Sequence, residues 1–203
     1  MFLARVCPLC NRPGPAPCEA CWISLDPAPP GPVPALVAFS GEGARLLKGL
    51  KYGNGRAVVA RLADGMSLLV EPCWADVVTW APTSAGRKRE RGYDQAELLA
   101  KAVARRLGAP CRGLLRRLPG EGPQTGRTRT ERLKGPGFAG KRQAPPRVLL
   151  IDDVVTTGCT LRSAASVLRM MGAREVRPLA AASTPDAAWS RTRRVPVTSD
   201  FAR

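Results

Sequence analysis

The sequence predicts an α/β fold: a parallel β-sheet flanked by helices and preceded by a small cysteine-rich module. Short apolar segments of strand type alternate with segments of helical periodicity, which is typical of a parallel sheet with crossover helices. Four of the seven cysteines fall within the first 21 residues, where they form two C-x2-C pairs. The length of 203 residues suits one domain of about 150 residues with a small addition.

Four segments have the apolar periodicity of helices. In the clearest of them, apolar residues recur at steps of three and four between Ala96 and Leu107. Asp94 and Glu97 have the spacing of a capping box that opens this helix, and Gly108 is placed to end it. The expected helices cover residues 43–51, 55–69, 94–107 and 160–171.

Four short apolar runs predict strands. The most apolar of them, Val148 to Ile151, is continuous, which is typical of a strand buried in a parallel sheet. The expected strands cover residues 76–80, 114–118, 148–151 and 176–181. Residues 119–142 contain six glycines and three prolines with almost no apolar side chains, so we expect a long mobile loop there.

Composition along the chain predicts its organisation. We expect a cysteine-rich metal module at 1–26, a proline-rich linker at 27–35, the α/β domain at 36–185 and a basic tail at 186–203. We find no apolar run near 18 residues and no secretory signal at the N-terminus, so we expect a cytoplasmic protein without a membrane span.

The cysteine pairs Cys7–Cys10 and Cys18–Cys21 predict a structural zinc site. Each pair can form a tight knuckle, and two knuckles complete the tetrahedral thiolate shell that zinc prefers. A segment this short cannot bury a hydrophobic core. Metal binding would therefore supply the free energy that folds it. The alternative is that the four cysteines form two disulfides. The absence of a secretory signal and the presence of three further unpaired cysteines disfavour it.

The charge pattern points to a phosphate-bearing partner. The formal net charge is +16, and residues 84–142 carry sixteen basic and five acidic groups. Most of the basic groups are arginines, which bind phosphate bidentately. The alternative is a solvated, arginine-rich surface without a specific ligand. The chain contains no histidine, which excludes every mechanism and every zinc site that needs an imidazole.

The segment from Val148 to Thr160 carries the strongest signal. An apolar strand runs into Asp152 and Asp153, and a hydroxyl-rich turn then leads into a helix. Ligands of parallel sheets bind beyond the carboxyl ends of the strands, and a helix N-terminus favours an anion. Vicinal carboxylates can accept hydrogen bonds from a ribose diol or hold Mg²⁺. The turn supplies Thr156, Thr157, Gly158 and Thr160.

This segment resembles the PRPP-binding motif of type I phosphoribosyltransferases. Further segments narrow the resemblance to the ComF family, which is named for DNA uptake in natural competence. They are the four cysteines, Leu50-Lys51-Tyr52, Arg89 to Ala96, Gln124 and Glu131-Arg132. The resemblance covers roughly residues 7–182 and implies a type I phosphoribosyltransferase-like domain behind a zinc module.

The resemblance also implies roles for individual residues. Asp152 and Asp153 would hold the ribose hydroxyls and Mg²⁺, and the turn from 81 to 86 would take the place of the pyrophosphate loop. Residues 119–142 would close over the reacting centre. The implied 5′-phosphate ligands are Thr156, Thr157, Gly158, Cys159 and Thr160; the implied pyrophosphate ligands are Thr83, Ser84, Arg87 and Arg91; and Arg127 and Arg132 join the two acids as catalytic candidates.

Two functions stay open at this point. The chain is either a protein that binds PRPP or a related ribose phosphate during DNA uptake, or an active Mg²⁺-dependent phosphoribosyltransferase of nucleotide metabolism or salvage. In the first case, single-stranded DNA and DNA-uptake proteins are candidate partners. Aromatic residues do not alternate with the arginine run, which disfavours base stacking but leaves phosphate contacts open.

Overall fold

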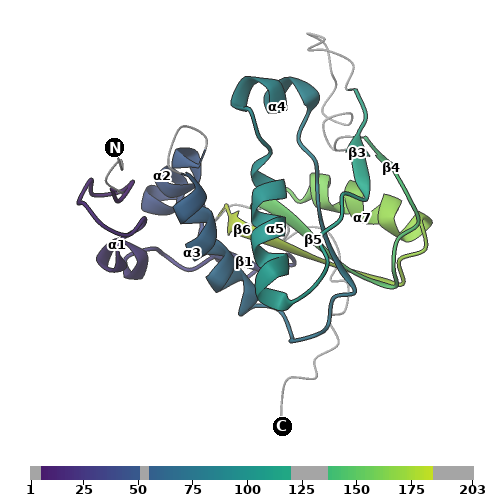
Figure 1. Cartoon of the computed structure of the whole chain (residues 1–203), viewed down its shortest axis with the longest axis horizontal. Coiled ribbons are helices and arrows are strands. Elements are labelled where there is room, and N and C mark those ends of the chain that lie inside the picture. The colour runs from purple at the N-terminus through teal and green to yellow at the C-terminus, as the bar shows by residue number, and fades with distance from the viewer. Residues whose placement is uncertain (1–5, 51–54, 120–136, 185–203) are drawn as a thin grey trace.

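The computed structural model describes residues 6–50, 55–119 and 137–184, and a parallel sheet forms its centre (Figure 1). In the described residues this sheet has four strands in the order β1-β6-β5-β2, all parallel to their neighbours. The strands are β1 (Ala35–Ala38), β2 (Val77–Trp80), β5 (Arg147–Val155) and β6 (Glu175–Ser183). The predicted α/β class, with a cysteine cluster at its N-terminal end, is confirmed.

Helices cover both faces of this sheet. The four expected helices are present to within about two residues, whereas α1 and α4 were not expected. Neither has an apolar stripe long enough to reveal it in the sequence, since α4 reads AGRKRER. The helices are α1 (Glu19–Ile23), α2 (Gly41–Gly49), α3 (Gly55–Ser67), α4 (Ala85–Arg91), α5 (Gln95–Leu107) and α7 (Cys159–Met170). No helix in the described ranges is long and apolar enough to cross a membrane.

The central strand β5 explains why the apolar run in the sequence is continuous. Leu149 and Ile151 belong to one buried cluster, which also contains side chains of α3 and α5. Val148 and Leu150 belong to a second cluster, which contains side chains of α7. Because helices pack on both faces, every side chain of this run is buried.

The segment 119–142 corrects one expectation. Its end forms strand β4 (Phe138–Gly140), which pairs antiparallel with β3 (Leu115–Arg117) in a small separate sheet. Phe138 explains the difference, because its ring is buried in the second cluster beside Leu114 and Leu115. One buried aromatic among glycines was too weak a signal for a strand. Residues 120–136 lie outside the described ranges.

The cysteine module packs directly on the α/β domain. Cys7 and Leu9 belong to the same buried cluster as Leu46 and Leu50 at α2. Arg45 donates a hydrogen bond to the Leu9 carbonyl at 3.0 Å, so polar contacts reinforce the apolar ones. Within the expected linker, Ala35 already begins β1. The module therefore shares its core with the domain.

Candidate functional site

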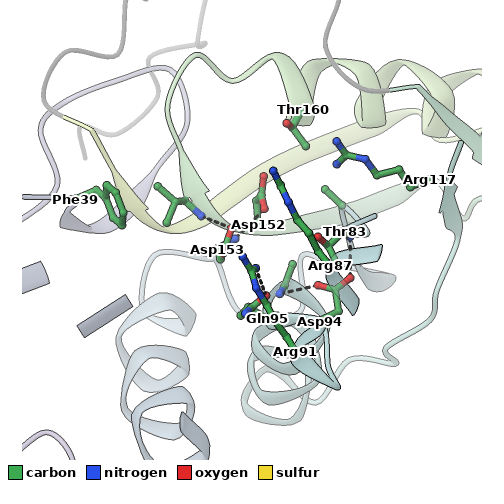
Figure 2. Close-up of a pocket in the computed structure, with 13 residues that line it drawn as sticks. Phe39, Thr83, Arg87, Arg91, Asp94, Gln95, Arg117, Asp152, Asp153 and Thr160 are labelled. Carbon is green, nitrogen blue, oxygen red and sulfur yellow. Dashed lines mark hydrogen bonds between the residues drawn. The ribbon is translucent and has the colours of Figure 1, made fainter. Parts of the chain in front are cut away.

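A pocket of about 320 Å³ lies where β5 and β2 end (Figure 2). Trp80, the last residue of β2, pairs with Ile151, so Asp152 and Asp153 extend beyond that strand. Both acids line the pocket. The space therefore opens at the carboxyl edge of the sheet, which is where parallel sheets bind ligands. The lining residues are Phe39, Ala81, Thr83, Arg87, Arg91, Asp94, Gln95, Ala96, Arg117, Asp152, Asp153, Val154 and Thr160.

The two acids differ in their surroundings. The side chain of Asp152 is buried, and its Oδ1 accepts a hydrogen bond from the Asp153 N–H at 2.9 Å. Burial, followed by repulsion from Asp153, raises the pKa of Asp152 well above its usual range. Asp153 is partly exposed, and its Oδ1 accepts from the Val154 N–H at 2.8 Å. A nearby cation or hydroxyl donor would therefore stabilise the charged form of this pair of carboxylates.

Asp94 fixes the turn that follows β2. Its Oδ2 accepts from the Thr83 N–H at 2.8 Å, while its Oδ1 caps α5 by accepting from Ala96 at 3.1 Å and Glu97 at 3.4 Å. Burial raises the pKa of Asp94, although these N–H donors act in the opposite direction. One carboxylate therefore joins the turn, the start of α5 and the wall of the pocket.

Three arginines of the described chain give the pocket its positive wall. Arg87 and Arg91 come from α4, whereas Arg117 comes from β3. Figure 2 shows Arg87 and Arg117 approaching Asp152 and Thr160 from different elements. Arg91 donates to the Gln95 Oε1 at 3.4 Å, and the buried Gln95 Nε2 has no partner among the described residues. The pocket therefore combines acids on the sheet with cations around them.

The N-terminus of α7 lies beside the acids. Gly158 is its N-cap, with φ of 67°, and no side chain caps the helix at that position. Thr160, in the first turn, lines the pocket. Arg162 donates to the Thr157 carbonyl at 2.9 Å and to the Cys159 Sγ at 3.0 Å, which ties the preceding turn to the helix. The partial positive charge at the N-terminus of a helix suits an anion here.

The structure brings about half of the predicted site residues to the pocket wall. Those that line it are Asp152, Asp153, Thr160, Thr83, Arg87 and Arg91. Thr156 and Thr157 are exposed on the turn before α7, while Gly158 and Cys159 begin the helix. Ser84 instead caps α4 by accepting from the Arg87 N–H at 3.4 Å. Arg127 and Arg132 lie outside the described residues.

Several residues that line the pocket are assigned no ligand-binding role from the sequence, among them Asp94, Gln95, Arg117 and Phe39. Asp94 is predicted as a helix cap, and both Asp94 and Gln95 belong to the segment that resembles the family, but neither is predicted to bind a ligand. Arg117 stood in a predicted strand without a role, although it is the last basic group before the glycine-rich segment. Phe39 follows β1, a strand that the sequence did not reveal. Arg117 and Phe39 needed the tertiary structure.

The four N-terminal cysteines form a second site. Their Sγ atoms all lie within 4.8 Å of one another, and the Cys10–Cys18 separation is 3.7 Å. Zinc–sulfur bonds of about 2.3 Å in a tetrahedron put sulfurs about 3.8 Å apart, so the cluster has the size that zinc requires. A disulfide would need about 2.05 Å, and all seven cysteines are free.

Backbone donors around Cys7 fit the same interpretation. The Cys18 N–H donates to the Cys7 Sγ at 3.4 Å. Burial raises the pKa of the Cys7 thiol, but N–H groups of Cys18, Cys10 and Leu9 outweigh it and bring the pKa down to about 6. Metal ligation needs the thiolate form, so the donor set and its surroundings fit a bound zinc ion.

Together, the fold and its two sites define an α/β protein with an acid–arginine pocket at the sheet edge and a four-thiol cluster packed on its core. Two curated proteins resemble the chain. It is 30% identical to Competence protein ComFC of Bacillus subtilis over 180 residues, covering 83% of this chain and 73% of that protein. The chain therefore belongs to the ComF family.

The second relative is matched over a shorter stretch. Competence protein F of Haemophilus influenzae is 35% identical over 99 residues, which covers 45% of this chain and 43% of that protein. The alignment thus spans less than half the length of that relative. No protein-family model matches the chain.

Solved structures of phosphoribosyltransferases also resemble the chain. A purine phosphoribosyltransferase from Pyrococcus horikoshii has a TM-score of 0.43 and 19% identity, covering 63% of this chain and 74% of that one. An adenine phosphoribosyltransferase from Thermoanaerobacter pseudethanolicus has a TM-score of 0.41 and 14% identity, and the match covers 68% of this chain and 84% of that one. The family is shown by the 30% identity to Competence protein ComFC.

Proposed function

We propose that the pocket at the end of β5 binds PRPP or a related ribose phosphate together with Mg²⁺. The observation that supports this most is the meeting of Asp152, Asp153 and the start of α7 at one edge of the sheet, opposite arginines. Vicinal carboxylates accept hydrogen bonds from a sugar diol, and a helix N-terminus accepts a phosphate. A ribose phosphate presents both groups.

The residues at the pocket suit a magnesium ion. Mg²⁺ prefers oxygen ligands from one or two carboxylates plus substrate phosphates. Burial, followed by repulsion from Asp153, raises the pKa of Asp152, so a cation bound beside the pair would stabilise its charged form. Asp152 and Asp153 would hold the ion, and a bound ion would neutralise charge on a leaving phosphate.

The alternative is an active phosphoribosyltransferase. In that reaction a nitrogen nucleophile forms a bond to ribose C1 as the C1–oxygen bond to pyrophosphate breaks, and the nucleophile gives up a proton. The cation-like sugar needs positive groups near the leaving group and exclusion of water. Arg87, Arg91 and Arg117 are available for the leaving group, and the protein contains no histidine to act as a base.

Ligand binding tests the proposal directly. Calorimetric titration of PRPP with Mg²⁺ into the full chain should give saturable binding. Asp153→Asn should weaken it at least about tenfold, which corresponds to about 1.4 kcal/mol. Asp64→Asn is the matched control, because Asp64 pairs with Arg106 on α3 and α5 outside the pocket lining. Equal affinity of the two variants would contradict the proposal.

A turnover assay distinguishes a protein that only binds PRPP from an active phosphoribosyltransferase. Release of pyrophosphate from PRPP and Mg²⁺ should be measured with a panel of nucleobases and other nitrogen nucleophiles. Release that depends on the nucleophile and is abolished by Asp153→Asn would establish the enzyme. Binding of PRPP without release across the panel would favour the binding protein.

We propose a cytoplasmic role in DNA uptake, on the basis of the two relatives named as competence proteins and of the net charge of +16. Basic groups attract nucleic acid phosphates in a salt-dependent way. Binding of labelled single-stranded DNA should weaken steeply between about 50 and 200 mM salt. Asp153→Asn should leave this binding unchanged. A flat salt response would exclude contacts to the DNA backbone.

A further inference from the structure

The small sheet of β3 and β4 carries basic side chains outside the pocket. Residues 109–119 and 137–146, which contain these strands, include five basic residues and no acidic one. Arg117 lines the pocket. The other basic residues are exposed, and we call them the basic face: Arg112, Arg116, Lys141 and Arg142.

The strand register brings two members of the basic face together. Arg116 pairs with Ala139, and the Lys141 N–H donates to the Leu114 carbonyl at 2.8 Å, which continues this register. Because side chains alternate along a strand, Arg116 and Lys141 point to one side of the sheet, whereas Arg117 points to the other. Arg116 and Lys141 are therefore diagonal neighbours, with Cα atoms about 7–8 Å apart.

Carboxylates do not neutralise the basic face in the part of the chain that the structure describes. The ion pairs found there use basic groups of α3, α4, α5, β5 and β6, and none involves β3 or β4. Arg112 and Arg142 lie within two residues of the contact between Leu114 and Lys141, so the positive charge extends beyond the diagonal pair. A chain of phosphates can contact several of these groups at once, which one small anion cannot do.

Helix α4 is the more basic segment by sequence, but most of its charges already have partners or a place in the pocket. Arg87 and Arg91 line the pocket. Lys88 pairs with Glu97 at 3.0 Å. This leaves Arg89 on α4, whereas the basic face has all of its charges available to a ligand in solution.

The basic face offers charge without a surface for base stacking. Phe138, the aromatic residue of β4, is buried beneath the small sheet. Contacts to the sugar–phosphate backbone need basic groups only, whereas tight binding of bases needs exposed aromatic rings or base-edge contacts. The face therefore suits a nucleic acid strand held through its backbone, with little dependence on base sequence.

We infer that the basic face is the surface through which the protein contacts the phosphate backbone of single-stranded DNA. The inference rests on the proposed role in DNA uptake and gives that role a location. Because Arg116 and Lys141 point away from the side of β3 that lines the pocket, the protein holds a DNA strand and a ribose phosphate at separate sites.

Two double variants with equal loss of charge test this location. Arg116→Gln with Lys141→Gln removes two charges from the basic face. Arg12→Gln with Arg105→Gln removes two exposed charges elsewhere, one of them in the cysteine module, which Figure 1 shows on the opposite side of the molecule from β3 and β4. Affinity for labelled oligothymidylate should be measured by fluorescence anisotropy between about 50 and 200 mM salt.

The face variant should bind the oligonucleotide at least about fivefold more weakly at the lowest salt. The slope of log affinity against log salt should become shallower by about 1.4, because two phosphate contacts are lost. The control variant should change affinity less than about twofold. Arg116→Lys with Lys141→Arg keeps both charges and should bind like wild type. PRPP, added at constant Mg²⁺, should not displace the oligonucleotide.

Equal losses in the face and control variants would overturn the basic face, and a steep salt response of wild type would then still support the DNA role. The face would also be overturned by displacement of the oligonucleotide by PRPP, or by a charge-keeping variant that binds as weakly as the glutamine variant. A wild-type chain that does not bind the oligonucleotide would contradict the DNA role and the face together, while the PRPP titration would judge the pocket independently.

Discussion

Individual residues at the sheet edge combine structural and ligand-facing roles. Asp94 shows this most clearly, because its carboxylate accepts from three backbone N–H groups while it also lines the pocket. Gln95, the next residue, orients Arg91 through its Oε1. The sequence motif that contains both residues therefore shapes the pocket wall as well as the start of α5.

Replacing Asp94 by alanine should cost stability in two ways. The variant loses the N-cap of α5, worth about 1 kcal/mol, and leaves the Thr83 N–H without its partner, worth about 1–3 kcal/mol. We expect the free energy of unfolding, measured with urea, to fall by about 2–4 kcal/mol. Ser84→Ala is the control, because its cap on α4 is a single 3.4 Å contact. A loss no larger than that of the control would contradict this account.

The backbone conformation at the start of α7 favours a glycine at position 158. Its φ of 67° is a conformation that residues with a Cβ adopt at a cost of about 1–2 kcal/mol. Gly158→Ala should therefore lower the free energy of unfolding by about that amount. Gly86→Ala is the counterpart, since its added methyl meets open space within α4. It should be neutral or stabilising, and a similar loss in both variants would count against the explanation.

At the scale of elements, an ion pair joins the starts of β2 and β5. Arg147 donates to Asp76 Oδ1 through Nε at 3.1 Å and Nη2 at 2.7 Å, and its backbone N–H donates to Oδ2 at 2.9 Å. These hydrogen bonds from Arg147 lower the pKa of Asp76. The pair lies at the amino end of the sheet, opposite the pocket, so it aligns strands without taking part in binding.

This pair predicts a pH dependence of stability. Because the folded-state pKa of Asp76 is lowered, its contribution is fully present above the ordinary carboxyl pKa of about 3.9. It is lost as pH falls through the lowered value. Asp76→Asn should therefore unfold at lower urea than wild type at pH 7 and pH 5, and the gap should narrow below about pH 4. Glu19→Gln, which breaks a more exposed pair with Arg61, should show a smaller gap. A gap independent of pH would contradict the role of the carboxylate.

At the scale of the whole molecule, the cysteine cluster and the α/β domain share one buried core. Cys7, Leu9 and Ala16 belong to the buried cluster that also contains side chains of α2, α3 and α5. Arg61 on α3 contacts this module twice, with its guanidinium 5.0 Å from the Trp22 ring centre and 2.6 Å from the Glu19 carboxylate. Unfolding of the cysteine module should therefore destabilise the α/β domain as well.

Metal removal tests this coupling. We predict about one zinc per chain by elemental analysis. Cys10→Ser, at an exposed member of the cluster, should lose it and lower Tm by about 6 °C or more. A loss of about 3 kcal/mol has that effect in a chain of this size. Cys73→Ser, an exposed cysteine outside the cluster, should keep both zinc and Tm. Unchanged Tm in a zinc-free Cys10→Ser variant would show that the metal does not support the domain.

The sequence by itself determined the α/β class, the main helices and strands, the four-cysteine cluster and the acid pair at the end of β5. These features depend on local periodicity and on spacing along the chain, which the sequence contains directly. Only the tertiary structure decided that β3 and β4 form a separate antiparallel pair and that Arg117 and Phe39 join the pocket wall. Such contacts depend on which distant segments become neighbours, and one buried ring or one arginine has no periodicity from which to predict it.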